Sequence, residues 1–308
     1  MIPILDWQRL ESDPDGFAQD LGQACREVGF FMIANPPLEA ALVAEVFAQA
    51  DAFFAQPTAR KAPLALRNNP HNRGWVGQGE ERLDNASGMQ DQKEAFNIGF
   101  DLEAEDPRVL AGEAFRGVNI WPQDLPQFRD VMLRYYDEAL RFGVALHGAF
   151  ERDLGLKPGF FAPHFTAPMA TLRLLSYPAA TGRDGEIGAG AHTDYGSVTL
   201  LVTDGEAGLQ VQPRGSDDWV DVPKIAEAVV VNIGDCLMRW SNDTYVSNPH
   251  RVLPPANPRR SIAFFLDPNP DSEIAVLPGT GTPCYPPILA ADYLRMRLDA
   301  TYDRKEHT

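Results

Sequence analysis

Basic residues are scarce in this chain: 27 Lys and Arg stand against 43 Asp and Glu, giving a formal net charge of −16 over 308 residues. Binding the phosphates of a nucleic acid or an anionic membrane requires clustered Lys and Arg, so the composition argues against a broad surface for either. An acidic ligand would instead be held by a few well-placed basic side chains. We therefore expect a small-molecule substrate as the partner.

Cysteine and long apolar runs are also in short supply. The chain has three cysteines, far apart, which form neither a CxxC pair nor a disulfide framework. No run approaches the roughly 18 apolar residues of a membrane span, and the first residues lack the features of a signal peptide. We expect a cytoplasmic protein, with a monomer as the default state.

Proline and glycine are plentiful, 26 and 25 residues, which suits a β-rich or loop-rich fold. Helical periodicity predicts helices over residues 13–28, 37–54, 125–156 and 289–302, and a buried strand at 30–33. About 60 residues rich in Gly, Asn and Pro follow the second helix, and we expect an ordered functional loop there. Short β-forming runs separated by turns then favour an antiparallel sandwich or jelly roll; they cover residues 171–177, 197–203, 209–212, 219–222, 229–233, 245–253 and 261–266.

The sharpest chemical signal is the sequence His192-Thr193-Asp194. In an extended segment, side chains two residues apart project from the same face, so His192 and Asp194 would converge on one point. His250 is the third candidate. Two imidazoles and one carboxylate make the facial triad that binds non-haem Fe(II) and leaves positions open for substrate and O2.

A second pair of polar residues follows the triad, again two residues apart on a predicted strand. Arg259 would be costly inside a barrel unless a carboxylate pairs with it. A planar guanidinium beside the hydroxyl of Ser261 suits bidentate binding of a ligand carboxylate. The sequence thus predicts an anion site close to a metal.

These motifs resemble the isopenicillin N synthase-like Fe(II)/2-oxoglutarate oxygenases. The resemblance rests on His192-Thr193-Asp194, on His250 and on Arg259-Arg260-Ser261. Supporting matches extend over nearly the whole chain: Ile2 to Asp6, Val28 to Phe31, Arg173 to Pro178, Asn232 to Asp235, and Ile262 to Phe265.

The resemblance implies an α+β fold with a mainly β core, a double-stranded β-helix (jelly roll) flanked by helices. Residues 1–120 would form the N-terminal helix and strand region of non-haem dioxygenases, and residues 121–308 the oxygenase core with its closing helix, together one structural unit. It also implies an oxygenase that uses Fe(II), 2-oxoglutarate and O2 to oxidise, most simply to hydroxylate, an unactivated C–H bond, releasing succinate and CO2.

Residue roles follow from the same resemblance. His192, Asp194 and His250 would bind iron, and Arg259 and Ser261 the distal carboxylate of 2-oxoglutarate, assisted by Tyr177. Arg173 matches an arginine near the cosubstrate in the ethylene-forming enzyme branch, where a glutamate equivalent to Glu81 reads a guanidinium substrate. Further residues are candidates for the substrate pocket: Tyr195, Phe96 and Trp240.

Three alternatives remain open from the sequence. The first is a 2-oxoglutarate-independent iron oxidase or cyclase of the isopenicillin N synthase type, which would use Arg259 and Ser261 on its own substrate. The second is a zinc hydrolase built on the same three ligands, which leaves Arg259 without a role. The third is a binding protein without catalysis, which would not need a complete triad.

Overall fold

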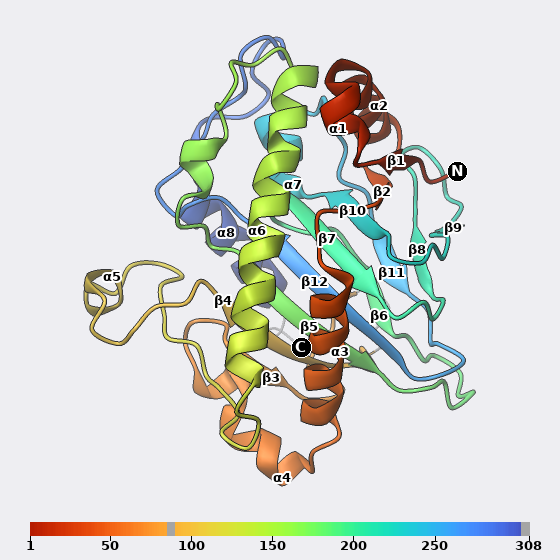
Figure 1. Cartoon of the computed structure of the whole chain (residues 1–308), viewed down its shortest axis with the longest axis vertical. Coiled ribbons are helices and arrows are strands. Elements are labelled where there is room, and N and C mark those ends of the chain that lie inside the picture. The colour runs from red at the N-terminus through yellow and green to blue at the C-terminus, as the bar shows by residue number, and fades with distance from the viewer. Residues whose placement is uncertain (85–89, 303–308) are drawn as a thin grey trace.

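A computed structural model of the chain describes residues 1–84 and 90–302. One large sheet dominates it, with the long helix α6 and helix α3 lying across the front of that sheet in Figure 1. A smaller sheet stands behind it, and the two make the jelly roll that the sequence predicted.

The large sheet has eight strands in the order β1-β2-β10-β7-β12-β5-β4-β3. All neighbours are antiparallel except β1 and β2, which are parallel. The strands are β1 (Ile4–Asp6), β2 (Phe30–Ala34), β3 (Gly74–Val76), β4 (Glu94–Gly99), β5 (Thr171–Tyr177), β7 (Val198–Thr203), β10 (Val229–Ile233) and β12 (Arg259–Leu266).

The smaller sheet has four strands in the order β6-β11-β8-β9. They are β6 (Ala189–His192), β11 (His250–Val252), β8 (Leu209–Val211) and β9 (Val220–Asp221). A separate hairpin-like pair joins β13 (Glu273–Ile274) to β14 (Ile288–Leu289), just before the last helix.

Helices α2, α3 and α6 pack against the outer face of the large sheet, whereas α8 contacts β14 and contributes to the cavity lining. The longer ones are α2 (Pro14–Glu27), α3 (Ala40–Phe54), α6 (Phe128–Asp153) and α8 (Ala290–Tyr302). The short ones are α1 (Arg9–Ser12), α4 (Thr58–Lys61), α5 (Pro107–Leu110) and α7 (Asp235–Trp240), with 3-10 turns η1 (Ala62–Leu64), η2 (Leu66–Asn68) and η3 (Ala162–Phe165).

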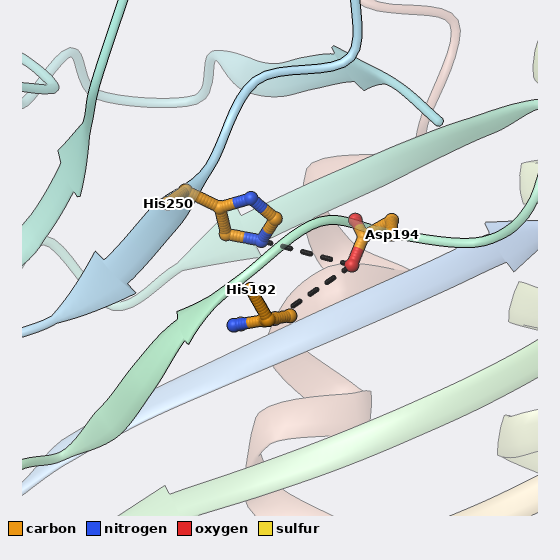
Figure 2. Close-up of side chains that lie close together, drawn as sticks. All are labelled: His192, Asp194 and His250. Atoms are coloured by element: carbon orange, nitrogen blue, oxygen red, sulfur yellow. Dashed lines mark ion pairs between the residues drawn. The ribbon is translucent and has the colours of Figure 1, made fainter. Parts of the chain in front are cut away.

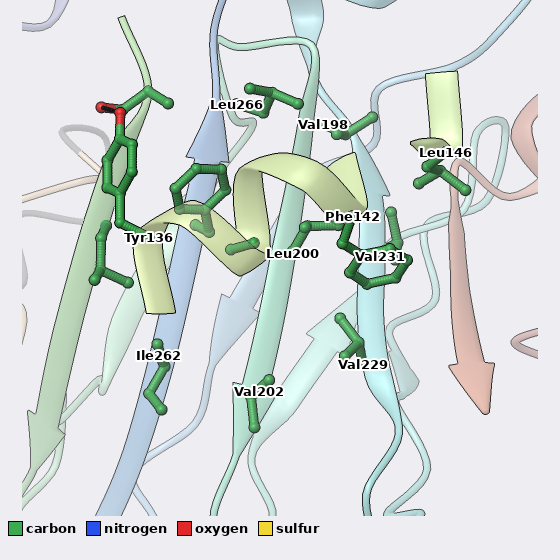
Figure 3. Close-up of a cluster of buried hydrophobic side chains, with 14 of the residues drawn as sticks. Tyr136, Phe142, Leu146, Val198, Leu200, Val202, Val229, Val231, Ile262 and Leu266 are labelled. Atoms are coloured by element: carbon green, nitrogen blue, oxygen red, sulfur yellow. Dashed lines mark hydrogen bonds between the residues drawn. The ribbon is translucent and has the colours of Figure 1, made fainter. Parts of the chain in front are cut away.

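Strand alternation divides the large sheet into an apolar outer face and a polar inner face. On β7, the even-numbered residues Val198, Leu200 and Val202 are buried against α6, where Phe142 and Leu146 also lie (Figure 3). The odd-numbered residues of the same strand face the smaller sheet. The main hydrophobic core therefore lies between the large sheet and its helices, and the inner face is left for the site.

The predicted strands 171–177 and 229–233 match β5 and β10. Several short strands were missed, β3 and β4 among them. β3 and β4 lie within the segment predicted as a long loop, because each is short and carries glycine, which weakens the strand pattern. The predicted strand 245–253 shortens to β11, since Pro249 lacks the amide hydrogen that a ladder needs.

The N-terminal region and the oxygenase core share one sheet. β1 and β2 extend the large sheet beyond β10, and β3 and β4 extend it beyond β5 at the opposite edge. The first 120 residues thus supply both edges of a sheet whose centre comes from the rest of the chain.

Candidate metal centre and cosubstrate pocket

Three metal-ligand side chains meet where β6 and β11 pair. His192 ends β6 and lies directly opposite His250, which begins β11, so their ring centroids are 4.2 Å apart. Asp194 follows β6 by two residues and turns its carboxylate toward both rings (Figure 2). One ligand atom from each residue lies within 4.8 Å of the other two, and no other group of three such residues in the described ranges does this.

Hydrogen bonds determine which atom each ligand offers. The Nδ1 atom of His192 lies 2.7 Å from the carbonyl oxygen of Gly190. Because a carbonyl oxygen can only accept, Nδ1 must carry the hydrogen, and Nε2 therefore has the free lone pair. The Nε2 atoms of His192 and His250 lie 3.7 and 3.6 Å from Oδ1 of Asp194. All three free donor atoms therefore point at one another.

The second oxygen of Asp194 accepts two hydrogen bonds from the large sheet. Its Oδ2 accepts from Oγ1 of Thr199 at 2.5 Å and from Nδ2 of Asn232 at 2.8 Å. Both donors stand on the inner face of the large sheet, on β7 and β10. These two hydrogen bonds leave Oδ1 free to bind a metal through a single oxygen. Donors of this kind, behind a ligand, orient it toward the metal.

Protonation states suit metal binding. Burial, and next the charge of His250, lower the pKa of His192 to about 3, so its imidazole is neutral at neutral pH. Burial alone would raise the pKa of Asp194, but the two imidazoles, Thr199 and Asn232 outweigh it and lower that pKa. A neutral imidazole and an ionised carboxylate are the forms that ligate a divalent ion.

The donor set fits Fe(II). Two imidazole nitrogens and one carboxylate oxygen form the facial triad with positions left open, and the same three residues line a cavity of about 220 Å³. Residues from both sheets line that cavity, so it lies between them.

A basic site lies in the same cavity. Arg259 is 1% exposed and its guanidinium stacks over the ring of Tyr177, 4.9 Å from the centroid. Its polar contacts are long, 3.4 Å to Oγ of Ser261 and 3.4 Å to the carbonyl of Glu206, and no carboxylate of residues 1–84 and 90–302 pairs with it. The register Arg259 to Tyr177 and Ser261 to Leu175 places these groups side by side.

Glu81 and Arg173 lie together in the cavity wall rather than apart. Nη2 of Arg173 donates to Oε2 of Glu81 at 2.5 Å, and Nζ of Lys93 lies 3.4 Å from the same oxygen. Lys93 also pairs with Asp91 at 2.5 Å, and Asp91 accepts from the backbone of Gly190 at 3.0 Å. Glu81 and Arg173 thus form a half-buried ion pair in the cavity wall.

The remaining predicted substrate residues divide into two groups. Tyr195 lines the cavity, with Arg297 of α8 stacked over its ring at 4.8 Å. Phe96 and Trp240 lie in the hydrophobic core instead, against Phe53 and Phe161 respectively. Phe96 takes this place because it alternates on β4 with Asn97, which faces inward.

Sequence reasoning missed several residues of the site. Thr199, Lys93 and Asp91 carry no motif, and only the strand pairing reveals their contacts. Asn232 belongs to a segment that resembles the family, Asn232 to Asp235, but no role was predicted for it. Its position in an otherwise apolar strand could have indicated one, because a buried amide needs a hydrogen-bond partner.

Two family models match the chain. The N-terminal model of the non-haem dioxygenase in morphine synthesis covers residues 2–124, and the 2OG-Fe(II) oxygenase superfamily model covers residues 168–268.

Within residues 1–84 and 90–302, no helix combines the length and apolarity needed to cross a membrane.

Individual relatives agree with the family models. The 2-oxoglutarate-Fe(II) type oxidoreductase hxnY of Emericella nidulans is 34% identical over 99% of this chain and 91% of that protein. Clavatol oxidase claD of Penicillium crustosum is 32% identical over 98% and 96%. A full-length Neurospora crassa protein, crystallised in complex with alpha-KG, is 31% identical over 98% and 96%, with a TM-score of 0.86.

Relatives named as 2-oxoglutarate-dependent dioxygenases exclude the zinc hydrolase and the binding protein as the basic function, and they set aside the 2-oxoglutarate-independent oxidase. Fe(II), 2-oxoglutarate and O2 are accordingly the cofactor and cosubstrates. The chain belongs to the isopenicillin N synthase-like Fe(II)/2-oxoglutarate-dependent oxygenases and is a non-haem iron dioxygenase.

Proposed function

We propose that this chain hydroxylates an unactivated C–H bond of a small molecule, with His192, Asp194 and His250 as the iron ligands. Arg259, Ser261 and Tyr177 hold the distal carboxylate of 2-oxoglutarate. When bound, the iron and 2-oxoglutarate supply the oxidising power by activating O2, with release of succinate and CO2. The carrying observation is the buried guanidinium of Arg259, which lacks a carboxylate partner among the described residues, in the cavity that also contains the triad.

The protein's own part is positioning. Thr199 and Asn232 orient Asp194, and the carbonyl of Gly190 fixes the ring of His192. Leu294 and Leu298 of α8 add an apolar wall to the cavity. Together these contacts keep the ligand atoms convergent and limit water near the reacting bond.

The test compares two histidine variants. His192→Ala removes a ligand, so O2 uptake and succinate formation with iron and 2-oxoglutarate should fall to background. His164→Ala is the matched control, because its ring lies away from the cavity, beside Trp240, with Nδ1 3.1 Å from Oγ of Ser272. Equal O2 uptake by His192→Ala and the unmodified protein would refute the iron assignment.

Assembly and location complete the proposal. We propose a monomer acting in the cytoplasm. Light scattering during size-exclusion chromatography should give a mass near 34.0 kDa. A mass twice that value would show a dimer and refute the proposed monomer.

A further inference from the structure

One buried arginine in the cavity has no assigned role. Arg73 directly precedes β3, is 2% exposed and lines the same cavity as the triad. Its Nη1 donates to the carbonyl of His71 at 2.9 Å and, at 3.4 Å, to that of Asn72. Its Nε is buried and has no hydrogen-bond partner among the described residues.

The guanidinium of Arg73 occupies a place on the inner face of the large sheet. A Cβ built on Gly99 would lie 1.8 Å from Cζ of Arg73, so the guanidinium fills the space where a side chain of β4 would stand. Gly99 pairs with Thr171, Thr171 with Phe265, and Phe265 with Thr199. Arg73 therefore lies in the row of inward positions that also contains the support of Asp194.

This row sets the distance between the arginine and the metal site. β4 and β7 are three strands apart in the sheet, which corresponds to roughly 14 Å at about 4.8 Å per strand. A small molecule placed between them could touch the guanidinium with one end and present a C–H bond to the iron with the other. Phe115 and Met169 line the same cavity and supply apolar surface for its body.

Two arginines of the cavity, Arg73 and Arg259, have no carboxylate partner among the described residues, and Arg259 is already assigned to 2-oxoglutarate. Arg173 and Lys93 are paired with Glu81, and Lys93 also with Asp91. Burial lowers the pKa of Arg73 to about 10, and the ionisable groups that act on it are Tyr136 and Arg116, the second of which repels it. Arg73 remains a cation at neutral pH, and a buried cation without a carboxylate is costly.

We propose that Arg73 binds the carboxylate of the substrate, so the enzyme's substrates are small apolar or aromatic monocarboxylic acids. This inference rests on the function proposed above, because the cavity must also hold iron and 2-oxoglutarate. A planar guanidinium with an unpaired Nε–H is the group that recognises a carboxylate in bidentate fashion.

The competing explanation is purely structural, with Arg73 serving only to fasten the chain through carbonyl groups. Arg116 provides the matched control for it. Arg116 is also buried, also has an unpaired Nε, and donates to the carbonyls of Ala167 and Pro168, but it lies outside the cavity lining. A structural role would make both arginines respond alike.

The experiment measures ligand binding to the enzyme loaded with Fe(II) and saturating 2-oxoglutarate, without O2, by calorimetry. The probes are benzoate, phenylacetate and cyclohexanecarboxylate, each beside its primary amide. We expect at least one acid to bind at least tenfold more tightly than its amide. Arg73→Gln should abolish that preference, and Arg116→Gln should retain it.

A second variant guards against misfolding of Arg73→Gln. Gly99→Ala keeps the arginine but adds the Cβ that would displace its guanidinium, so it should also weaken acid binding at least tenfold. The inference is overturned if none of the acids binds, if amides bind equally well, or if the acids compete with 2-oxoglutarate. Succinate formation by the unmodified enzyme without any probe tests the proposed function separately.

Discussion

Removing the amide of Asn232 should weaken iron binding without removing a ligand. Asn232 is 3% exposed, and its Nδ2 donates to Oδ2 of Asp194 at 2.8 Å. In Asn232→Ala, that oxygen keeps only the hydroxyl of Thr199. The carboxylate then loses part of the restraint that directs Oδ1 toward the histidine nitrogens.

The size of the expected loss in Fe(II) affinity follows from the charge on Asp194. A hydrogen bond to a charged group contributes about 1.5–3 kcal/mol, and loss of such outer support typically reduces metal affinity about 10- to 100-fold. We expect the dissociation constant for Fe(II) to rise within that range. Thr199→Val should have a similar effect, since its hydroxyl donates to the same oxygen at 2.5 Å.

The assay is an anaerobic Fe(II) titration without 2-oxoglutarate, with the melting temperature recorded for each variant. Thr203→Val is the matched control, because Thr203 lies on the same strand and face as Thr199 but four residues from it, beside Ser261. It should bind Fe(II) like the unmodified protein. Fe(II) affinities of Asn232→Ala and Thr199→Val within twofold of the unmodified protein, with folding intact, would refute this account of Asp194.

Three further predictions concern other ionisable side chains. Arg259→Gln should raise the KM for 2-oxoglutarate about 100-fold, because a buried charge pair is lost, while Fe(II) affinity stays the same; succinate formation against 2-oxoglutarate concentration measures it. Glu81→Gln should lower the free energy of unfolding by about 3 kcal/mol, since Arg173 loses its carboxylate. Burial alone would raise the pKa of Glu81, but its cationic partners lower it from 4.5 to about 2, so this difference should be complete above pH 4.5 and shrink as the pH falls toward 2 in urea titrations. Burial lowers the pKa of His147 from 6.5 to about 4, so its stabilising contribution is complete above pH 6.5 and lost as the pH falls; His147→Gln should show a flatter dependence of stability on pH between 7 and 4.

The parts of the site that could be predicted are those with a local signature. His192 and Asp194 are two residues apart, and Arg259 and Ser261 are again two apart, so alternation alone puts each pair on one face. The strands β5 and β10 were predicted because β-branched and leucine residues fill them.

The parts that could not be predicted depend on pairing between distant segments. Glu81 meets Arg173 across 92 positions of sequence, and Glu81 itself lies outside any strand, in the segment between β3 and β4. Arg73 likewise looked like part of a glycine-rich loop, and its burial follows from the missing side chain of Gly99. Such contacts depend on sheet register, which no short motif encodes.

The placement of the N-terminal strands also bears on how the chain is made. β2 pairs with β10, and Ile33 lies opposite Val229. During synthesis, β2 therefore emerges long before β10 and stays unpaired on that edge until β10 is made. Contacts between such distant segments slow folding, and an unpaired strand edge is prone to join other chains. We expect that the nascent chain depends on slow synthesis or chaperones until Val229–Ile233 emerges from the ribosome, and that fragments ending before it aggregate.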